Sequence, residues 1–339
     1  MLYNKTIGVV VPCYNVSNQI DRVIETMPHY VDHIICVDDC SEDDTRERIS
    51  KYSSSDSRTI LISNFSNQGV GGAIGEGYAW ARDRNIDVTV VMAGDGQMDP
   101  ADLPDIIKPV ASSRVDYTKG NRFYNPDVLK KMPLIRLLGN IVLSFLTKIT
   151  SGYWHIADSQ SGYTAVSLKV LKTIDPMAIY KRYGMPNDFL VTLNIFDFSV
   201  EDVPVNPLYG IGEKSGIKIP SVISSIGFLI IRLFIKRMVL KYIYKSFHPL
   251  VLLYLFGFPA LLFGSIAGIT ILVIDIFHTS LQIGYGWMIF FAMLILSSYF
   301  SIVIAMFMDM EYNRHLHKRW SQANENSPPS RPSQKQHYG

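Results

Sequence analysis

The 339-residue sequence predicts an α/β domain with a mostly parallel sheet, followed by a pair of transmembrane helices. Strand-like and helix-like segments alternate over residues 6–93, which is typical of βαβ units. Two uncharged runs then follow, at residues 249–274 and 281–308. Each is long enough to cross a hydrocarbon core of about 30 Å, which takes about 20 helical residues. The alternative is that both runs are buried helices of a large soluble core.

The N-terminal elements can be placed in order. We expect strands at 6–11, 33–37, 59–63 and 88–93, and helices at 17–27, 43–50 and 72–84. Pro12 is expected to end the first strand. In parallel α/β sheets the ligand lies beyond the carboxyl ends of the strands. The residues that follow strands there, and therefore the candidate site, are Pro12 to Asn15, Asp38 with Asp39, and Gly94 to Gln97.

Two amphipathic segments lie closer to the C-terminus. Residues 134–149 are almost wholly apolar, but Arg136, Asn140, Ser144 and Lys148 share one helix face. Residues 221–245 mix basic side chains with apolar ones. Both segments are predicted to be helices in the plane of lipid headgroups. For the first, the alternative is a core helix with one wet edge.

These segments define four predicted parts of the chain. The domain covers 1–220 and includes the interfacial helix 134–150. A juxtamembrane helix covers 221–246, the transmembrane pair 247–310, and a disordered tail 311–339, rich in Ser, Pro, Asn and Gln from residue 321.

Charge predicts the orientation in the membrane. Residues 215–274 contain neither Asp nor Glu. Their basic residues are Lys218, Arg232, Lys236, Arg237, Lys241 and Lys245. Arg314, Lys318 and Arg319 follow the second run, whereas the joint at 275–280 has no basic residue. The positive-inside rule then places the domain and both termini in the cytoplasm. The basic residues are expected to face anionic headgroups.

The remaining composition fits a cytosolic domain. No apolar run of signal-peptide type occurs in the first 60 residues. Cys13, Cys36 and Cys40 show no metal-ligand spacing and are expected to be reduced. The formal net charge is +2, and we expect no nucleic-acid partner.

Two segments suggest nucleotide binding. One carboxylate of Asp38 and Asp39 is expected to bind a nucleobase or ribose; the alternative is a simple turn, with Ser41 capping the next helix. Residues 67–73, with Gly69, Gly71 and Gly72, open a helix, and their backbone N–H groups could approach a phosphate.

Asp95 is the candidate metal ligand. It follows an apolar strand, between Gly94 and Gly96. Its carboxylate and the amide oxygen of Gln97 are ligands that Mg²⁺ accepts beside substrate phosphates. The alternative is an aspartate that only shapes a turn.

Six segments in this order resemble family 2 glycosyltransferases with a GT-A fold: VPCYN, VDDCSEDDT, NQGVGGA, GDGQMDP, KGNRF and DSQSGY. The basic helix and hairpin look like those of the polyprenyl-phosphate glycosyltransferases, the group of dolichyl-phosphate mannose synthase and bacterial undecaprenyl-phosphate enzymes. The resemblance covers residues 5–245 through motifs and the hairpin through architecture only.

The resemblance implies a role for each matching residue. The nucleotide sugar, a UDP-sugar being slightly favoured, would contact Pro12, Tyr14, Asn15, Asp38, Asp39, Gly69, Gly71 and Lys214. Mg²⁺ or Mn²⁺ would bind Asp95 and Gln97 against the diphosphate. Polyprenyl phosphate would bind Arg122, Arg136 and Asn140. Asp158, Gln160, Ser161 and Gly162 would line the sugar pocket, and Asp188 would lie near the reacting centre.

The implied reaction is transfer of a hexose-type sugar to the lipid phosphate with inversion. The sequence departs from the family pattern at the first position of Asp-x-Asp, where Ala93 stands, and at Val16, Val70, Tyr209 and the Lys214-Ser215 pair. Two alternatives remain: another lipid or a polysaccharide as acceptor, or a non-catalytic nucleotide-sugar-binding scaffold. A homo-oligomer is possible.

Overall fold

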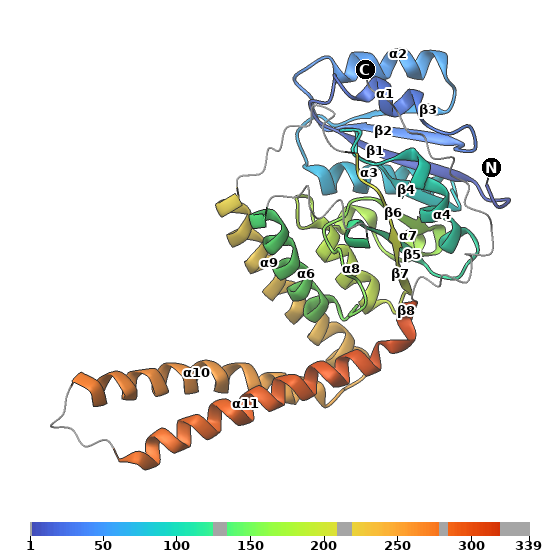
Figure 1. Cartoon of the computed structure of the whole chain (residues 1–339). Helices are drawn as coiled ribbons and strands as arrows, with labels where there is room; N and C mark the ends of the chain where they lie inside the picture. Colours follow the sequence, from blue (N-terminus) through green and yellow to red (C-terminus); the bar gives the residue numbers. More distant parts are fainter. Residues whose placement is uncertain (1, 125–133, 209–218, 278–283, 319–339) are drawn as a thin grey trace.

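A computed structural model of the chain describes residues 2–124, 134–208, 219–277 and 284–318. An α/β domain carries a long helical hairpin that projects away from it (Figure 1). The strands are β1 (Ile7–Cys13), β2 (His33–Asp38), β3 (Thr59–Ser63), β4 (Val88–Val91), β5 (Tyr117–Asn121), β6 (Thr164–Ser167), β7 (Val200–Pro204) and β8 (His317–Lys318).

The helices of the domain cover both faces of the sheet. They are α1 (Ile20–Glu25), α2 (Thr45–Ser55), α3 (Val70–Asp83), α4 (Leu103–Ala111), α6 (Leu134–Ser151), α7 (Leu168–Thr173) and α8 (Met185–Ile195). Short 3₁₀ turns are η1 (Pro100–Asp102), η2 (Arg122–Tyr124) and η3 (Pro176–Ala178). The membrane-side elements are α9 (Ile219–Val239), the π-helical η4 (Leu240–Lys245), α10 (Leu250–Phe277), α11 (Tyr285–Tyr312) and the 3₁₀ turn η5 (Arg314–Leu316).

Within the described residues the sheet is mixed, with the order β3-β2-β1-β4-β6-β5-β7-β8. Its first half is parallel, as predicted, and β6 runs antiparallel to β4 and β5. Alternation along β1 explains the two layers. Val9 and Val11 pack in the cluster that contains α1 and α4, whereas Val10 packs with α3. The core therefore lies on both sides of the sheet.

The prediction that Pro12 ends the first strand is wrong. β1 continues to Cys13, and Pro12 pairs with Val37 of β2. The carbonyl of Pro12 accepts from Gly94 N at 3.2 Å, on the side of β4, where the last ladder pair is Val10 with Val91. The missing N–H of Pro12 therefore falls beyond the end of the β4 ladder, where it costs no strand pairing.

The hairpin consists of two helices of 28 residues each that are long and apolar enough to cross a membrane. They pack on each other along their length, and a Cβ at Gly257 would lie 2.7 Å from Ile302. In the most apolar 18-residue stretch of each helix, only 6% of α10 and 17% of α11 is buried inside the protein. This low burial contradicts the alternative that both are buried helices of a soluble core. α10 continues to Phe277, so the first three residues of the predicted joint 275–280 are helical; the rest lies outside the described residues.

The chain returns to the domain after the hairpin. α11 runs to Tyr312, and β8 then pairs in parallel with β7 through Val200 and His317. Residues 311–318 are therefore helix, turn and strand, which corrects the predicted start of a disordered tail at 311. The rest of that predicted tail lies outside the described residues.

α6 and α9 lie side by side against the domain (Figure 1). The polar edge of α6 faces inward, where Ser144 Oγ lies 3.2 Å from Ser159 Oγ. Its outer face is apolar and exposed, and so is that of α9. The exposed residues are Leu138, Ile141, Val142, Phe145 and Leu146 on α6, and Phe228, Ile231, Ile235 and Val239 on α9. This arrangement is the reverse of a core helix with a wet edge.

Four of the basic residues near α10 were expected to face anionic headgroups. They contact protein carboxylates instead: Lys236 pairs with Asp188, Arg237 with Asp309, and Lys241 and Lys245 with Asp197. The partners come from α8, from the turn after it and from α11. Arg237 and Lys241 are buried and therefore have protein counter-ions in place of lipid ones, whereas Lys236 is partly exposed and Lys245 is exposed. Arg232 is exposed.

Candidate active site

The loops after β1 and β2 are joined by hydrogen bonds. Asn15, which has a φ of +53°, donates its N–H to Ser41 Oγ at 3.1 Å, and its side-chain oxygen accepts from Glu42 N at 2.8 Å. Tyr14 is 47% exposed beside them. α2 begins only at Thr45, so Ser41 does not cap it. The two loops form one continuous edge above the sheet.

Asp39 organises the loop before α3. Its buried carboxylate accepts hydrogen bonds from Gln68 N (2.8 Å), Gly69 N (2.7 Å) and Asn64 Nδ2 (2.9 Å). Asp38 is also buried and accepts from Ser41 N at 3.3 Å. In this conformation Asp39 shapes the wall of the predicted nucleotide site.

At the N-terminus of α3, two backbone N–H groups have acceptors within the protein. Gly71 N and Gly72 N donate to the carbonyl of Lys181 at 2.9 and 3.2 Å. A Cβ at Gly71 would lie 2.1 Å from the carbonyl oxygen of Tyr180. These N–H groups therefore have protein acceptors, contrary to the interpretation that they approach a phosphate, and Gly71 is needed for close packing.

Asp95 lies in a tight turn after β4. Gly96 adopts a φ of +74°, and Asp95 Oδ1 accepts from Gln97 N at 3.0 Å. The loop is fixed from the other side as well, because Gln97 O accepts from Leu208 N at 2.8 Å and Met98 pairs with Pro207. The turn thus holds Asp95 and Gln97 next to the segment that follows β7.

The donor atoms of this turn fit a hard divalent cation. They are carboxylate and amide oxygens, and Mg²⁺ commonly takes only one or two protein carboxylates, with phosphates and water completing its coordination. Among the described residues no group of three or more His, Cys, Asp or Glu could hold a metal by itself. A bound ion would therefore depend on the diphosphate of the substrate.

Arg122 and Asp158 are brought together. Arg122 Nε lies 2.6 Å from Asp158 Oδ2 and Nη2 lies 2.9 Å from Oδ1, and the carboxylate is fully buried. Sequence reasoning assigned these residues to different subsites, the acceptor phosphate and the sugar pocket. Their two-point contact instead joins η2 to the loop before β6.

The predicted sugar-pocket loop, residues 158–162, adjoins the Asp95 turn. A Cβ at Gly162 would lie 3.2 Å from Met98 Cε, and Tyr163 donates its hydroxyl to Asp99 O at 3.1 Å. Lys119 of β5 also contacts this loop, because its Nζ donates a hydrogen bond to Ser161 O at 2.5 Å. The predicted metal and sugar residues are therefore neighbours.

Sequence reasoning missed the buried polar floor under this loop. Asp202 Oδ2 accepts from Ala157 N at 2.7 Å and from Asn121 Nδ2 at 2.9 Å. Burial raises the pKa of Asp202 to about 7, and burial lowers the pKa of Lys119 to about 8. The available signal was a charged residue in the middle of each of two short strand segments, β5 and β7.

The remaining predicted residues lie on or near the membrane-side helices. Asp188, in the first turn of α8, accepts from Tyr180 N at 2.9 Å and from Lys236 Nζ at 3.2 Å, so it ties α8 to α9. Arg136 lies in the first turn of α6, and Asn140 follows it as a half-buried residue. Lys214 lies outside the described residues.

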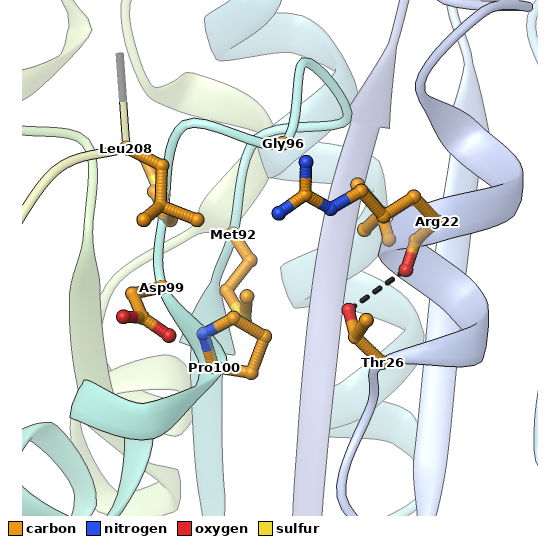
Figure 2. A pocket seen from close by; sticks show the side chains of 9 residues that line it. Arg22, Thr26, Met92, Gly96, Asp99, Pro100 and Leu208 are labelled. Atoms are coloured by element: carbon orange, nitrogen blue, oxygen red, sulfur yellow. Dashed lines mark hydrogen bonds between the residues drawn. The ribbon is translucent and has the colours of Figure 1, made fainter. Parts of the chain in front are cut away.

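A cavity of about 210 Å³ lies behind the Asp95 turn (Figure 2). The guanidinium of Arg22 points toward Gly96 across it, and Asp99 lies on the opposite side. The other lining residues are Val23, Thr26, Met92, Met98, Pro100 and Leu208. It borders the Asp95 turn through Gly96, Met98 and Leu208, but the side chains of Asp95 and Gln97 are not among its lining residues.

A mixed sheet whose carboxyl edge carries Asp39, Asp95 and a glycine-containing loop is the arrangement expected of a glycosyltransferase of the GT-A fold. A family model described as Glycosyl transferase family 2 matches residues 8–175. The UDP-N-acetylglucosamine–dolichyl-phosphate N-acetylglucosaminyltransferase of Methanococcus voltae is 32% identical over 219 residues, which cover 61% of this chain and 87% of the relative. The chain belongs to glycosyl transferase family 2.

Two further comparisons agree with this assignment. The undecaprenyl-phosphate mannosyltransferase of Micrococcus luteus is 26% identical over 58% of this chain and 81% of its own. The glucosyl-3-phosphoglycerate synthase of Mycobacterium tuberculosis, solved with Mn²⁺, UDP and glucosyl-3-phosphoglycerate, matches 69% of this chain and 80% of its own, with a TM-score of 0.50 and 16% identity. The second likeness shows the fold alone.

Proposed function

We propose that this glycosyltransferase moves a hexose-type sugar from a nucleotide diphosphate sugar, with a UDP-sugar slightly favoured, to polyprenyl phosphate. The observation that carries the proposal is the position of α6. Its outer face is exposed and apolar, whereas its inner edge contacts the loop of Asp158 and Ser161 through Ser144 and Ser159. The helix that we place at the bilayer surface therefore contacts the loop of the predicted sugar pocket.

The relatives support the choice of acceptor. The names of the two relatives described above specify dolichyl phosphate and undecaprenyl phosphate as their acceptors. Both are long isoprenoid phosphates, and their charged end lies at the depth of lipid headgroups. The apolar faces of α6 and α9 and the two apolar helices of the hairpin suit that depth.

We propose that α10 and α11 span the membrane and that the domain and both termini face the cytoplasm. The absence of basic residues in 275–280 and their abundance before α10 support this orientation. α6 and α9 would then lie in the headgroup plane. Association into a homo-oligomer also remains a prediction.

The transfer reaction does not need a strong general base. The acceptor phosphate, largely ionised near pH 7 because its second pKa is about 6, attacks the anomeric carbon opposite the leaving diphosphate and inverts the configuration. Arg122, Arg136 and Asn140 would bind the acceptor phosphate, and Asp158, Gln160, Ser161 and Gly162 the sugar. Asp188 would orient groups near the reacting centre rather than remove a proton.

The donor side would be held by the loops after β1, β2 and β4. Pro12, Tyr14, Asn15 and Asp38 would contact the base and ribose, with Asp39 and Gly69 shaping the adjacent wall and Gly71 packing behind it. Asp95 and Gln97 would bind Mg²⁺ or Mn²⁺, which supplies charge neutralisation for the departing diphosphate. Lys214 would add a second positive charge there.

The test is direct. The purified protein is incubated in detergent with polyprenyl phosphate and a panel of nucleotide sugars, and the glycolipid is identified by mass. Arg136→Ala should raise the KM for lipid phosphate and leave the donor KM unchanged, with the exposed Arg314→Ala as the matched control. Asp95→Ala should abolish metal-dependent turnover.

Three outcomes would contradict the proposal. Equal nucleotide release without isoprenoid phosphate would favour another acceptor. Binding of nucleotide sugars without any turnover would favour the scaffold. An unaltered acceptor KM in Arg136→Ala would remove that residue from the acceptor site.

A further inference from the structure

A buried chain of amides and hydroxyls connects α6 to the predicted sugar pocket through α8. Gln160 Nε2 donates to Ser159 Oγ at 2.7 Å and to Asn187 Oδ1 at 3.1 Å. On the other side, Thr147 Oγ1 of α6 lies 2.9 Å from the same Asn187 Oδ1. Asn187 is fully buried and Thr147 nearly so. These contacts fix the Gln160 side chain from inside the protein.

The hydrogen-bond capacity of Gln160 determines what it can offer a ligand. A primary amide has two N–H donors at one end and a carbonyl acceptor at the other. Both donors of Gln160 have buried acceptors, namely Ser159 and Asn187. Among the described residues none donates to Oε1. The carbonyl end is thus the part of this half-buried side chain that remains for the sugar.

Asn187 determines this orientation because its own carbonyl, and not its NH₂ group, faces Gln160. This orientation has a cost, since Asn187 Nδ2 is buried and has no hydrogen-bond partner in the described part of the chain, and such a group costs about 1–3 kcal/mol. A reversed amide would present NH₂ to Gln160 and would favour turning the Gln160 amide as well. Something must therefore stabilise the observed orientation.

Thr147 supplies that stabilisation. Its hydroxyl has a single proton and two acceptors within reach, Leu143 O at 2.7 Å and Asn187 Oδ1 at 2.9 Å. When the proton is directed to Asn187, the Asn187 carbonyl has a second donor besides Gln160. Thr150, one turn along α6, is equally buried, and within the described ranges it bonds only to Leu146 O in its own helix, at 2.8 Å.

We propose that Thr147 and Asn187 are positioning residues that hold Gln160 with its carbonyl oxygen toward the transferred sugar. The pocket then selects a sugar group that donates a hydrogen bond, a hydroxyl or an acetamido N–H. The inference rests on the proposed function, in which Gln160 lines the sugar pocket. It adds a selection by hydrogen-bond direction that is set from α6.

The test measures binding in detergent without any acceptor. Dissociation constants are obtained by titration calorimetry for UDP, UDP-glucose and UDP-N-acetylglucosamine, and for GDP and GDP-mannose. The readout is the ratio of the Kd of each nucleotide sugar to the Kd of its nucleotide, which isolates the sugar. Thr147→Val should raise this ratio about 3- to 10-fold, the effect of one weakened hydrogen bond.

Matched variants separate positioning from stability. Thr147→Ser keeps the hydroxyl and should stay within about twofold of the wild-type ratio, as should Thr150→Val. Gln160→Met should show the same loss as Thr147→Val, and the double variant should be no worse, because both act on one contact. If Thr147→Val does not fold, Asn187→Ser removes the same carbonyl and carries the same expectation.

Each outcome is decisive. A wild-type ratio in folded Thr147→Val overturns the inference, and so does an equal loss in Thr150→Val. Normal sugar transfer together with either result would leave the proposed function intact. Failure of the wild-type protein to bind any nucleotide sugar would instead overturn the proposed function, and the inference with it.

Discussion

The guanidinium of Arg237 on α9 forms a bidentate ion pair with the carboxylate of Asp309 on α11, with Nη1 2.9 Å from Oδ1 and Nη2 3.1 Å from Oδ2. Both side chains are fully buried. Arg237 also donates to Ile149 O of α6 at 2.9 Å, and Asn313 Nδ2 donates to Asp309 Oδ1 at 3.0 Å. This pair therefore fixes the second helix of the hairpin to the catalytic domain.

Breaking this pair should destabilise the protein strongly. Asp309→Asn leaves the Arg237 charge buried without its counter-ion, which typically costs about 3–5 kcal/mol. The expected result is a clear fall in the unfolding temperature, measured by scanning fluorimetry in detergent. Glu311→Gln on the same helix is the control, because its pair with Arg314 is exposed and such pairs contribute at most about 1 kcal/mol. Equal effects of the two substitutions would contradict this prediction.

The buried Asp202 predicts a pH dependence of stability. Its pKa is about 7 in the folded protein, above the value of about 3.9 in an unfolded chain. The folded state therefore binds the extra proton, and the stability from this group is fully present below pH 4 and is lost as the pH rises to about 7. The loss is at most about 1.4 kcal/mol per pH unit.

Asp202→Asn should remove this dependence while keeping the oxygen that accepts from Ala157 and Asn121. The unfolding temperatures of the two proteins are compared between pH 5 and 8. The unfolding temperature of the variant should rise relative to that of the wild type as the pH increases to about 7. Above that pH the difference between the two should stay constant. Asp175→Asn, an exposed cap, controls for loss of a carboxylate. Parallel curves over the whole range would show that Asp202 does not carry the effect.

Asp39 should matter for the donor through the loop that it holds. Asp39→Asn leaves one oxygen for three N–H donors and turns an NH₂ group toward one of them. Hydrogen bonds to a charged group contribute about 1.5–3 kcal/mol each, so the donor KM should rise about tenfold or more. The acceptor KM should stay unchanged. Asp44→Asn, exposed and without a side-chain cap hydrogen bond, is the matched control.

Two helical glycines should respond oppositely to alanine. At Gly71 the new Cβ would lie 2.1 Å from the backbone carbonyl of Tyr180, so Gly71→Ala must displace α3 or the 180–182 segment. We expect a lower unfolding temperature and weaker nucleotide binding. At Gly139 no described atom lies within 4 Å of the Cβ, so Gly139→Ala should be neutral or stabilise by up to about 1 kcal/mol. Wild-type behaviour of Gly71→Ala would refute the close packing.

The local elements were predictable because their signals are local. The β-branched run at Thr59–Ser63 gives β3 its predicted bounds, and the apolar periodicity before Arg84 gives α3 within two residues at its start. The hairpin follows from length and lack of charge. The antiparallel β6 and the two-residue β8 have no such signal, since their partners lie far away in the chain.

The contacts of charged side chains were not predictable. Arg237 and Asp309 are 72 residues apart, and nothing in the basic run before α10 indicates that its members face protein. Likewise, Arg122 and Asp158 were both identified, but their pairing depends on how η2 meets the loop before β6. Sequence motifs indicate which residues matter, whereas the packing of distant elements decides what each one touches.

The strand that follows the second apolar helix orders the biosynthesis of the molecule. β8 adds its two residues to β7 only after His317 and Lys318 have left the ribosome, when both helices of the hairpin have already been synthesised. The sheet is therefore completed last at its C-terminal edge. Completion of the sheet is in this way linked to the synthesis of both apolar helices.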